Sequence, residues 1–117
     1  MQHVVDAIKR LPVSGEEVDT TCLLGFTAEI RISFGQFDQA AASLTHALEI
    51  ANKNDERYYQ SELHRLKAEL AMAERGTDWQ AVAAKQLSKA RALAQSQNAG
   101  GWLNKITISE QRYLEIK

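Results

Sequence analysis

Residues 58–76 read YYQSELHRLKAELAMAERG, and this stretch decides the fold of the chain. Its apolar side chains recur along one line: Tyr59, Leu63, Leu66, Leu70 and Ala73. The positions i, i+4, i+7, i+11 and i+14 lie on one side of an α-helix. The pattern therefore predicts an amphipathic helix over about residues 56–75, ended by Gly76. Asn54 or Asp55 is expected to cap its start.

The same plan occurs one unit earlier and again one unit later. An apolar run over residues 16–34 is followed by Gly35 as a turn and by a second helical pattern over residues 36–52. A further helix is predicted from Trp79 to Gln97, opened by a Thr77-x-x-Gln80 capping box. Its small and apolar positions repeat those of the second helix at a constant separation of 43 residues: Ala40 and Ala83, Leu44 and Leu87, Ala47 and Ala90.

Such repetition is typical of stacked helix-turn-helix units. We predict an all-α fold in which antiparallel helix pairs stack as a short right-handed solenoid within one domain, residues 1–117. The pairs span about residues 16–52 and 56–97, with partial repeats at 2–11 and 102–116. The 43-residue spacing exceeds the roughly 34 residues of a tetratricopeptide (TPR) repeat, which we attribute to longer loops. The predicted packing residues are Phe37, Ala40, Leu44, Ala47, Leu63, Leu66, Leu70, Ala83, Leu87 and Ala90.

The same patterns predict where individual helices begin and which of their faces are buried. Ser14-x-x-Glu17 is a second capping box, expected to open the helix over residues 16–34. That helix has two apolar faces, both expected to be buried between neighbours: one holds Leu23, Phe26, Ile30 and Phe34, and the other Leu24, Ala28 and Ile32. In the fourth helix the predicted buried face also includes Val82. Residues 102–116 are predicted to form a fifth long helix. A frayed or partner-ordered tail is the alternative, because Ile106-Thr107-Ile108 is β-branched and its periodicity is poor.

Composition restricts the classes of function. The 117 residues carry 14 basic and 15 acidic side chains, a formal net charge of −1, so no concentrated basic surface for nucleic acid or anionic membrane is expected. The single cysteine, Cys22, excludes an intrachain disulfide and favours a buried thiol. No signal peptide or membrane-spanning stretch is visible, so a cytoplasmic protein is expected.

One segment is similar to a known family. Residues 61–70, SELHRLKAEL, preceded by Tyr58-Tyr59, resemble the C-terminal TPR-like region of bacterial ATPase-linked transcriptional activators and nucleotide-cyclase fusion proteins. Residues 27–48 are similar to the preceding repeat there. The resemblance implies a helical-repeat sensor or scaffold in a bacterial regulatory system. It carries over no ATPase, cyclase or DNA-binding activity, because the chain lacks a Gly-x-x-x-x-Gly-Lys-Ser/Thr loop and the other motifs of those domains.

The charged residues leave two interpretations open. Glu62, Arg65 and Glu69 recur on one face of the third helix, as either a solvated face with weak ion pairs or the lining of a partner-binding groove. The groove interpretation also includes Glu29 on the first helix, because the first helix of each TPR repeat lines the binding groove. No catalytic, metal-binding or cofactor site is predicted, since the three histidines lack ligand spacing and no nucleophile has a partner.

The leading hypothesis is a protein-interaction module, with a small-molecule effector sensor as the alternative and an enzyme ranked last. The exposed ends of a short solenoid need covering, because an uncapped repeat leaves an apolar face in water. A second copy of the chain is the simplest cover, so a homodimer is expected.

Overall fold

The computed structural model describes residues 17–98 and 100–116. These residues form five α-helices and no strand, so the predicted all-α fold class is confirmed for this part of the chain. The helix predicted over residues 2–11 and the Ser14 capping box lie outside the described residues. The helices are α2 (Glu17–Ser33), α3 (Phe37–Lys53), α4 (Arg57–Glu74), α5 (Trp79–Ser96) and α6 (Gly100–Ile116).

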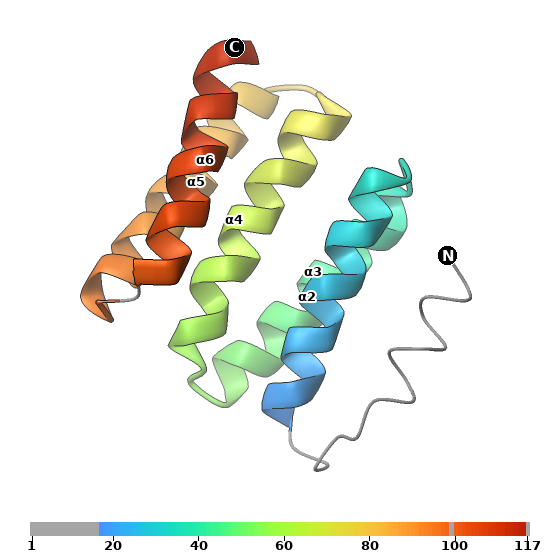
Figure 1. Ribbon diagram of the computed structural model, residues 1–117. Helices are drawn as coiled ribbons and strands as arrows, with labels where there is room; N and C mark the ends of the chain where they lie inside the picture. The colour runs from blue at the N-terminus through green and yellow to red at the C-terminus, as the bar shows by residue number, and fades with distance from the viewer. Residues whose placement is uncertain (1–16, 99, 117) are drawn as a thin grey trace.

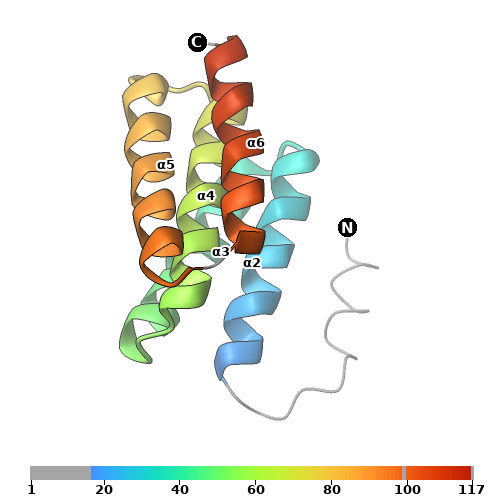
Figure 2. The same cartoon turned by 60° about the vertical axis from the view of Figure 1, so that its left-hand side comes forward.

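The helices lie in two layers. In Figure 1, α2, α4 and α6 lie side by side in the near layer and run in the same direction, with α3 and α5 behind them; Figure 2 shows the same layers from a second side. The main contacts join α2 with α3 and α4, α3 with α4, α4 with α5 and α6, and α5 with α6. The helix α4 therefore lies at the centre and contacts all four others.

Three apolar clusters hold the layers together. The first joins α2, α3 and α4 around the fully buried Leu44, Leu63 and Leu66. The second joins α4 and α5 through Ala68, Met72, Ala83 and Leu87, and α6 adds the partly buried Tyr113 and Ile116. The third joins α5 and α6. Of the predicted packing residues, Phe37 and Leu70 are half-buried. The remaining eight are buried: Ala40, Leu44, Ala47, Leu63, Leu66, Ala83, Leu87 and Ala90.

Small side chains determine how closely the helices approach. An added Cβ at Gly25 in α2 would lie 3.3 Å from Leu63 Cδ2 and 3.8 Å from Leu66 Cδ1. The glycine therefore lets α2 lie directly against α4. Ala68, Ala83 and Ala90 are completely buried for the same reason, because an alanine leaves room for the facing helix.

The turns differ from several predictions. Gly35 has φ +74° and reverses the chain between α2 and α3, as predicted. Arg75 rather than Gly76 adopts the left-handed conformation that ends α4, with φ 53°. The residues before α4 and α5 are Glu56 and Asp78, and neither side chain caps its helix. The predicted N-cap at Asn54 or Asp55 and the predicted capping box at Thr77 are therefore wrong. The chain is directed into α4 and α5 by Asp55 and Asp78, which adopt the left-handed backbone conformation.

One of the two faces of α2 that were predicted to be buried is largely exposed. Phe26 and Phe34 are 51% and 66% exposed, and Leu23 and Ile30 are only partly covered. Cys22, predicted to be buried, is also exposed. These predictions were wrong because both neighbours of α2 among the described residues, α3 and α4, lie on its other face, around Ala28 and Leu24.

Two further burial predictions were wrong. Ala73 is exposed and Met72 is buried in its place, because α5 and α6 pack against that side of the last turn of α4. Val82 is 42% exposed on α5, which buries Ala83 and Leu87 instead. The last segment forms the helix α6 and not a frayed tail; Ile106 is completely buried against Ala90 and Ala94 of α5. Packing has thus overcome the weak helical preference of its β-branched residues.

Candidate functional site

A buried cation lies at the centre of the near layer. Arg65 of α4 is only 7% exposed, and its guanidinium forms a two-pronged pair with Glu62 one turn earlier. Arg65 Nε donates to Glu62 Oε1 and Arg65 Nη2 donates to Glu62 Oε2, each at 2.8 Å. Paired charge-assisted hydrogen bonds of this kind are strong and directional. The pair fixes the plane of the guanidinium.

The remaining donors of Arg65 reach both neighbouring helices. Nη2 lies 3.4 Å from Glu29 Oε2 on α2, and Nη1 donates to Ser109 Oγ on α6 at 3.2 Å. Ser109 in turn donates to Glu69 Oε2 at 2.7 Å. One guanidinium therefore links α2, α4 and α6, and we call Glu29, Glu62, Arg65, Glu69 and Ser109 the Arg65 cluster.

Two exposed cations of α6 complete the charge balance of the Arg65 cluster. Lys105 Nζ lies 3.7 Å from Glu62 Oε2, and Arg112 Nη1 lies 3.0 Å from Glu69 Oε1. Positions 105 and 62 differ by 43, as do 112 and 69. The matching separation follows from the parallel course of α4 and α6. It is also the separation that relates Ala40 to Ala83.

The charges of the Arg65 cluster reinforce one another. Burial on its own would lower the pKa of Arg65. The hydrogen bonds from Arg65 to Glu62 and the negative charges of Glu62, Glu29 and Glu69 outweigh that effect, so the pKa of Arg65 is raised. The guanidinium is accordingly a permanent cation.

The structure brings together all four residues predicted for a groove. Glu29, Glu62, Arg65 and Glu69 share one site, but Arg65 and Glu69 are buried there. The interpretation as a solvated face with weak pairs is therefore wrong for these two residues. Helix α6 lies beside α4 and covers them, and Glu29 remains the exposed member.

Sequence reasoning missed the residues that α6 contributes. Ser109 belongs to the Arg65 cluster, and Lys105 and Arg112 pair with its carboxylates, yet none of the three was predicted. The available signal was the 43-residue separation applied to charged positions, since it pairs Glu62 with Lys105 and Glu69 with Arg112. That separation had been applied only to small and apolar positions.

Two small hollows flank the Arg65 cluster, each of about 130 Å³. One lies towards the beginnings of α4 and α6 and is lined by Phe26, Glu29, Tyr59, Glu62 and Trp102, with other residues. The second lies further along the helices. It is lined by Glu29, Ile32, Ser33, Arg65, Leu66, Glu69 and Arg112. Both hollows are formed by α2, α4 and α6 together.

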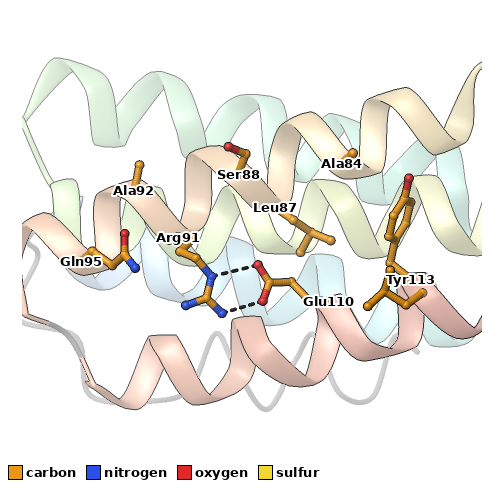
Figure 3. A pocket seen from close by; sticks show the side chains of 9 residues that line it. Ala84, Leu87, Ser88, Arg91, Ala92, Gln95, Glu110 and Tyr113 are labelled. Atoms are coloured by element: carbon orange, nitrogen blue, oxygen red, sulfur yellow. Dashed lines mark hydrogen bonds and ion pairs between the residues drawn. The ribbon is translucent and has the colours of Figure 1, made fainter.

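A larger groove of about 510 Å³ runs between α5 and α6. Figure 3 shows Arg91 of α5 and Glu110 of α6 facing each other within this groove, with Tyr113 further along. Arg91 Nε donates to Glu110 Oε2 at 2.9 Å, and Arg91 Nη2 donates to Thr107 Oγ1 at 2.9 Å. The hydrogen bond to Glu110 raises the pKa of Arg91. Leu114, 61% exposed, also lines this groove.

His64 lies on α4 beside α5. Its Nδ1 is 2.7 Å from Gln86 Oε1, an acceptor, so the ring carries its proton on Nδ1. Burial lowers the pKa of His64, and the positive charges of Lys89 and Lys67 lower it further, against the opposing effect of Gln86. His64 is therefore neutral in the folded protein at neutral pH.

No group of His, Cys, Asp and Glu side chains in residues 17–98 and 100–116 is placed to hold a metal ion. In the same residues, no helix combines the length and apolar character needed to cross a membrane. Comparison with protein-family models, with curated proteins and with solved structures found no match.

We expect Arg65→Met to lower the free energy of unfolding by roughly 3–5 kcal/mol, because Glu62 would lose both of its short hydrogen bonds and the two carboxylates would keep only the exposed Lys105 and Arg112 as partners. Urea unfolding followed by circular dichroism measures the change. Arg112→Met is the matched control. Arg112 is 59% exposed at its side chain, so its loss should cost no more than about 1 kcal/mol. Equal effects of the two substitutions would contradict the central role assigned to Arg65.

We also expect a pH dependence that originates at His64. Because its pKa in the folded protein lies below the ordinary value of 6.5, the unfolded chain takes up the proton first as the pH falls. The contribution of His64 to the free energy of unfolding is fully present above pH 6.5. It decreases as the pH falls towards the pKa of His64 in the folded protein. His64→Gln should flatten this decrease in urea titrations at a series of pH values. His46→Gln, at an exposed site on α3, should leave it unchanged.

Proposed function

We propose that this protein is a helical-repeat interaction module whose binding face is formed by α2, α4 and α6. The observation that carries the proposal is the Arg65 cluster, in which charged side chains from these three parallel helices converge on one face. Glu29, Lys105 and Arg112 keep about half of their side chains exposed there, beside two hollows. A partner segment lying across the helices would meet both signs of charge at fixed positions.

The order of contacts supports a repeat architecture. The main contacts join helices that are adjacent or next-but-one in sequence, as expected when helix pairs stack in a row. The constant separation of 43 residues relates the apolar positions of α3 and α5, and it also relates the ion-pair partners of α4 and α6. We therefore propose a short TPR-like solenoid, in which α2, α4 and α6 are the first helices of successive units.

The biological setting is proposed from the family resemblance of residues 58–70. It suggests a regulatory protein of a bacterial transcriptional or signalling system, located in the cytoplasm. In such a system the module would recognise another protein, and an attached or separate effector would act on the result.

Charge reversal on the proposed binding face should remove partner binding. A partner captured by the wild-type chain and identified by mass spectrometry is titrated by calorimetry with purified variants. Glu29→Lys and Arg112→Glu should each weaken binding at least about tenfold, since they reverse exposed charges without removing Arg65. Lys85→Glu, on the exposed side of α5, is the control and should bind as the wild type does. A partner that binds all three variants equally would exclude this face.

We further propose that the chain forms a homodimer through the groove between α5 and α6. The groove holds one cation, Arg91, and one anion, Glu110, so a two-fold related copy presents the complementary pair. Leu114 and Tyr113 supply apolar surface beside this ion pair, and the groove is large enough to accept side chains from a second molecule.

Leu114→Glu should convert the dimer to a monomer, because two-fold symmetry would bring the new charges onto the apolar part of both surfaces. Multi-angle light scattering measures the mass at several concentrations. Phe34→Glu changes an equally exposed apolar residue at the opposite end of the molecule, and it should leave the dimer intact. A wild-type chain that stays monomeric at high concentration contradicts the proposal.

A further inference from the structure

One of the two hollows beside the Arg65 cluster is rich in aromatic side chains. Its volume is about 130 Å³, and each of three helices contributes one aromatic residue: Phe26 from α2, Tyr59 from α4 and Trp102 from α6. Two carboxylates, Glu29 and Glu62, also line it. We refer to it as the aromatic pocket.

We propose that the aromatic pocket binds an alkylated ammonium group, the head group shared by choline-like molecules and by methylated lysine side chains. Such cations are attracted to the negative faces of aromatic rings, and their methyl groups need no hydrogen-bond partners. The nearby carboxylates add a longer-range attraction. A cavity of about 150 Å³ suffices for benzene, so a pocket of this size suits a compact head group of similar bulk.

The chain already places a cation at this pocket. Lys105 Nζ lies 5.1 Å from the centroid of the Trp102 ring and 3.7 Å from Glu62 Oε2. One ammonium is thus held by an aromatic face and a carboxylate, the same two kinds of group that would hold the proposed ligand. Lys105 keeps 48% of its side chain exposed and can turn into solvent when a ligand enters.

Loss of the Lys105 contact leaves the Arg65 cluster intact. Glu62 keeps both hydrogen bonds to Arg65, so it does not become an unpaired buried charge. Glu29 is 48% exposed at its side chain, and its carboxylate can attract an incoming cation. The pocket therefore exchanges one ammonium for another without disturbing the pairing that joins the helices.

The aromatic pocket belongs to the proposed binding face of α2, α4 and α6, and its biological meaning rests on that proposed function. A free cation would bind to the pocket whether or not a protein partner exists. Failure of the pocket and failure of the partner-binding face are therefore separate results.

The test is a calorimetric titration of the full chain with choline and with its neutral isostere, 3,3-dimethylbutan-1-ol. Choline should bind at least about tenfold more tightly than the isostere. Lys105→Ala should strengthen choline binding several-fold, since the internal competitor is gone, and Lys85→Ala on α5 should not change it. Equal affinities for choline and the neutral isostere, or a Lys105→Ala variant that binds choline no more tightly than the wild type, would overturn the proposal.

Two variants test the aromatic walls. Trp102→Leu should reduce choline binding at least tenfold, and circular dichroism reports whether it is folded. If Trp102→Leu does not fold, Phe26→Ala is tested in its place, because Phe26 is half-exposed and its loss should leave the fold intact. Unchanged choline affinity in either folded variant also contradicts the proposal.

A peptide carrying trimethyllysine is titrated beside choline to distinguish the source of the cation. Tighter binding of the peptide than of both choline and the unmethylated peptide assigns the pocket to a protein-borne ligand. Equal binding of the methylated peptide and choline assigns it to a free small molecule. A peptide whose affinity is the same with and without methylation, together with no choline binding, rejects the pocket.

Discussion

The guanidinium of Arg65 lies where three helices meet, and its charge must be satisfied at that place. Moving such a group out of water costs several kcal/mol, and only good geometry offsets the cost. Glu62 supplies two aligned acceptors from the same helix, while Glu29 and Ser109 supply the others from α2 and α6. Interlocking side chains set how these neighbours pack on α4. The directional hydrogen bonds of the Arg65 cluster add to that packing and link α2 and α6 to the same group.

The apolar part of the architecture could be predicted from the sequence, because it depends on the spacing of residues along each helix. Helical spacing places Leu63 and Leu66 on one face whatever lies opposite, and Ala40 and Ala83 mark places where another helix can approach closely. The all-helical class and the position of Gly35 depend on such local rules. They were therefore predictable.

What could not be predicted depends on neighbours distant in sequence. Phe26 and Phe34 satisfy the pattern of a buried face, but a pattern does not reveal whether another helix is present to cover it. The N-cap predicted at Asn54 or Asp55 and the capping box predicted at Thr77 failed because left-handed residues at Asp55 and Asp78 redirect the chain before α4 and α5 begin. For the site, Glu62, Arg65 and Glu69 were recognisable on one face, whereas their burial by α6 required knowledge of how three helices pack.

The Arg65 cluster combines a permanent part with an exchangeable part. Arg65 is buried, and Glu62 holds it through two short hydrogen bonds, so this pair stays formed whenever the protein is folded. Lys105 reaches the same carboxylate at a longer distance from a half-exposed position, and its contact can be replaced by another cation. Glu62 belongs to both parts, so a cation bound in the aromatic pocket would lie beside the same carboxylate that pairs with Arg65. The cation beside this carboxylate can therefore change while its two hydrogen bonds to Arg65 stay in place.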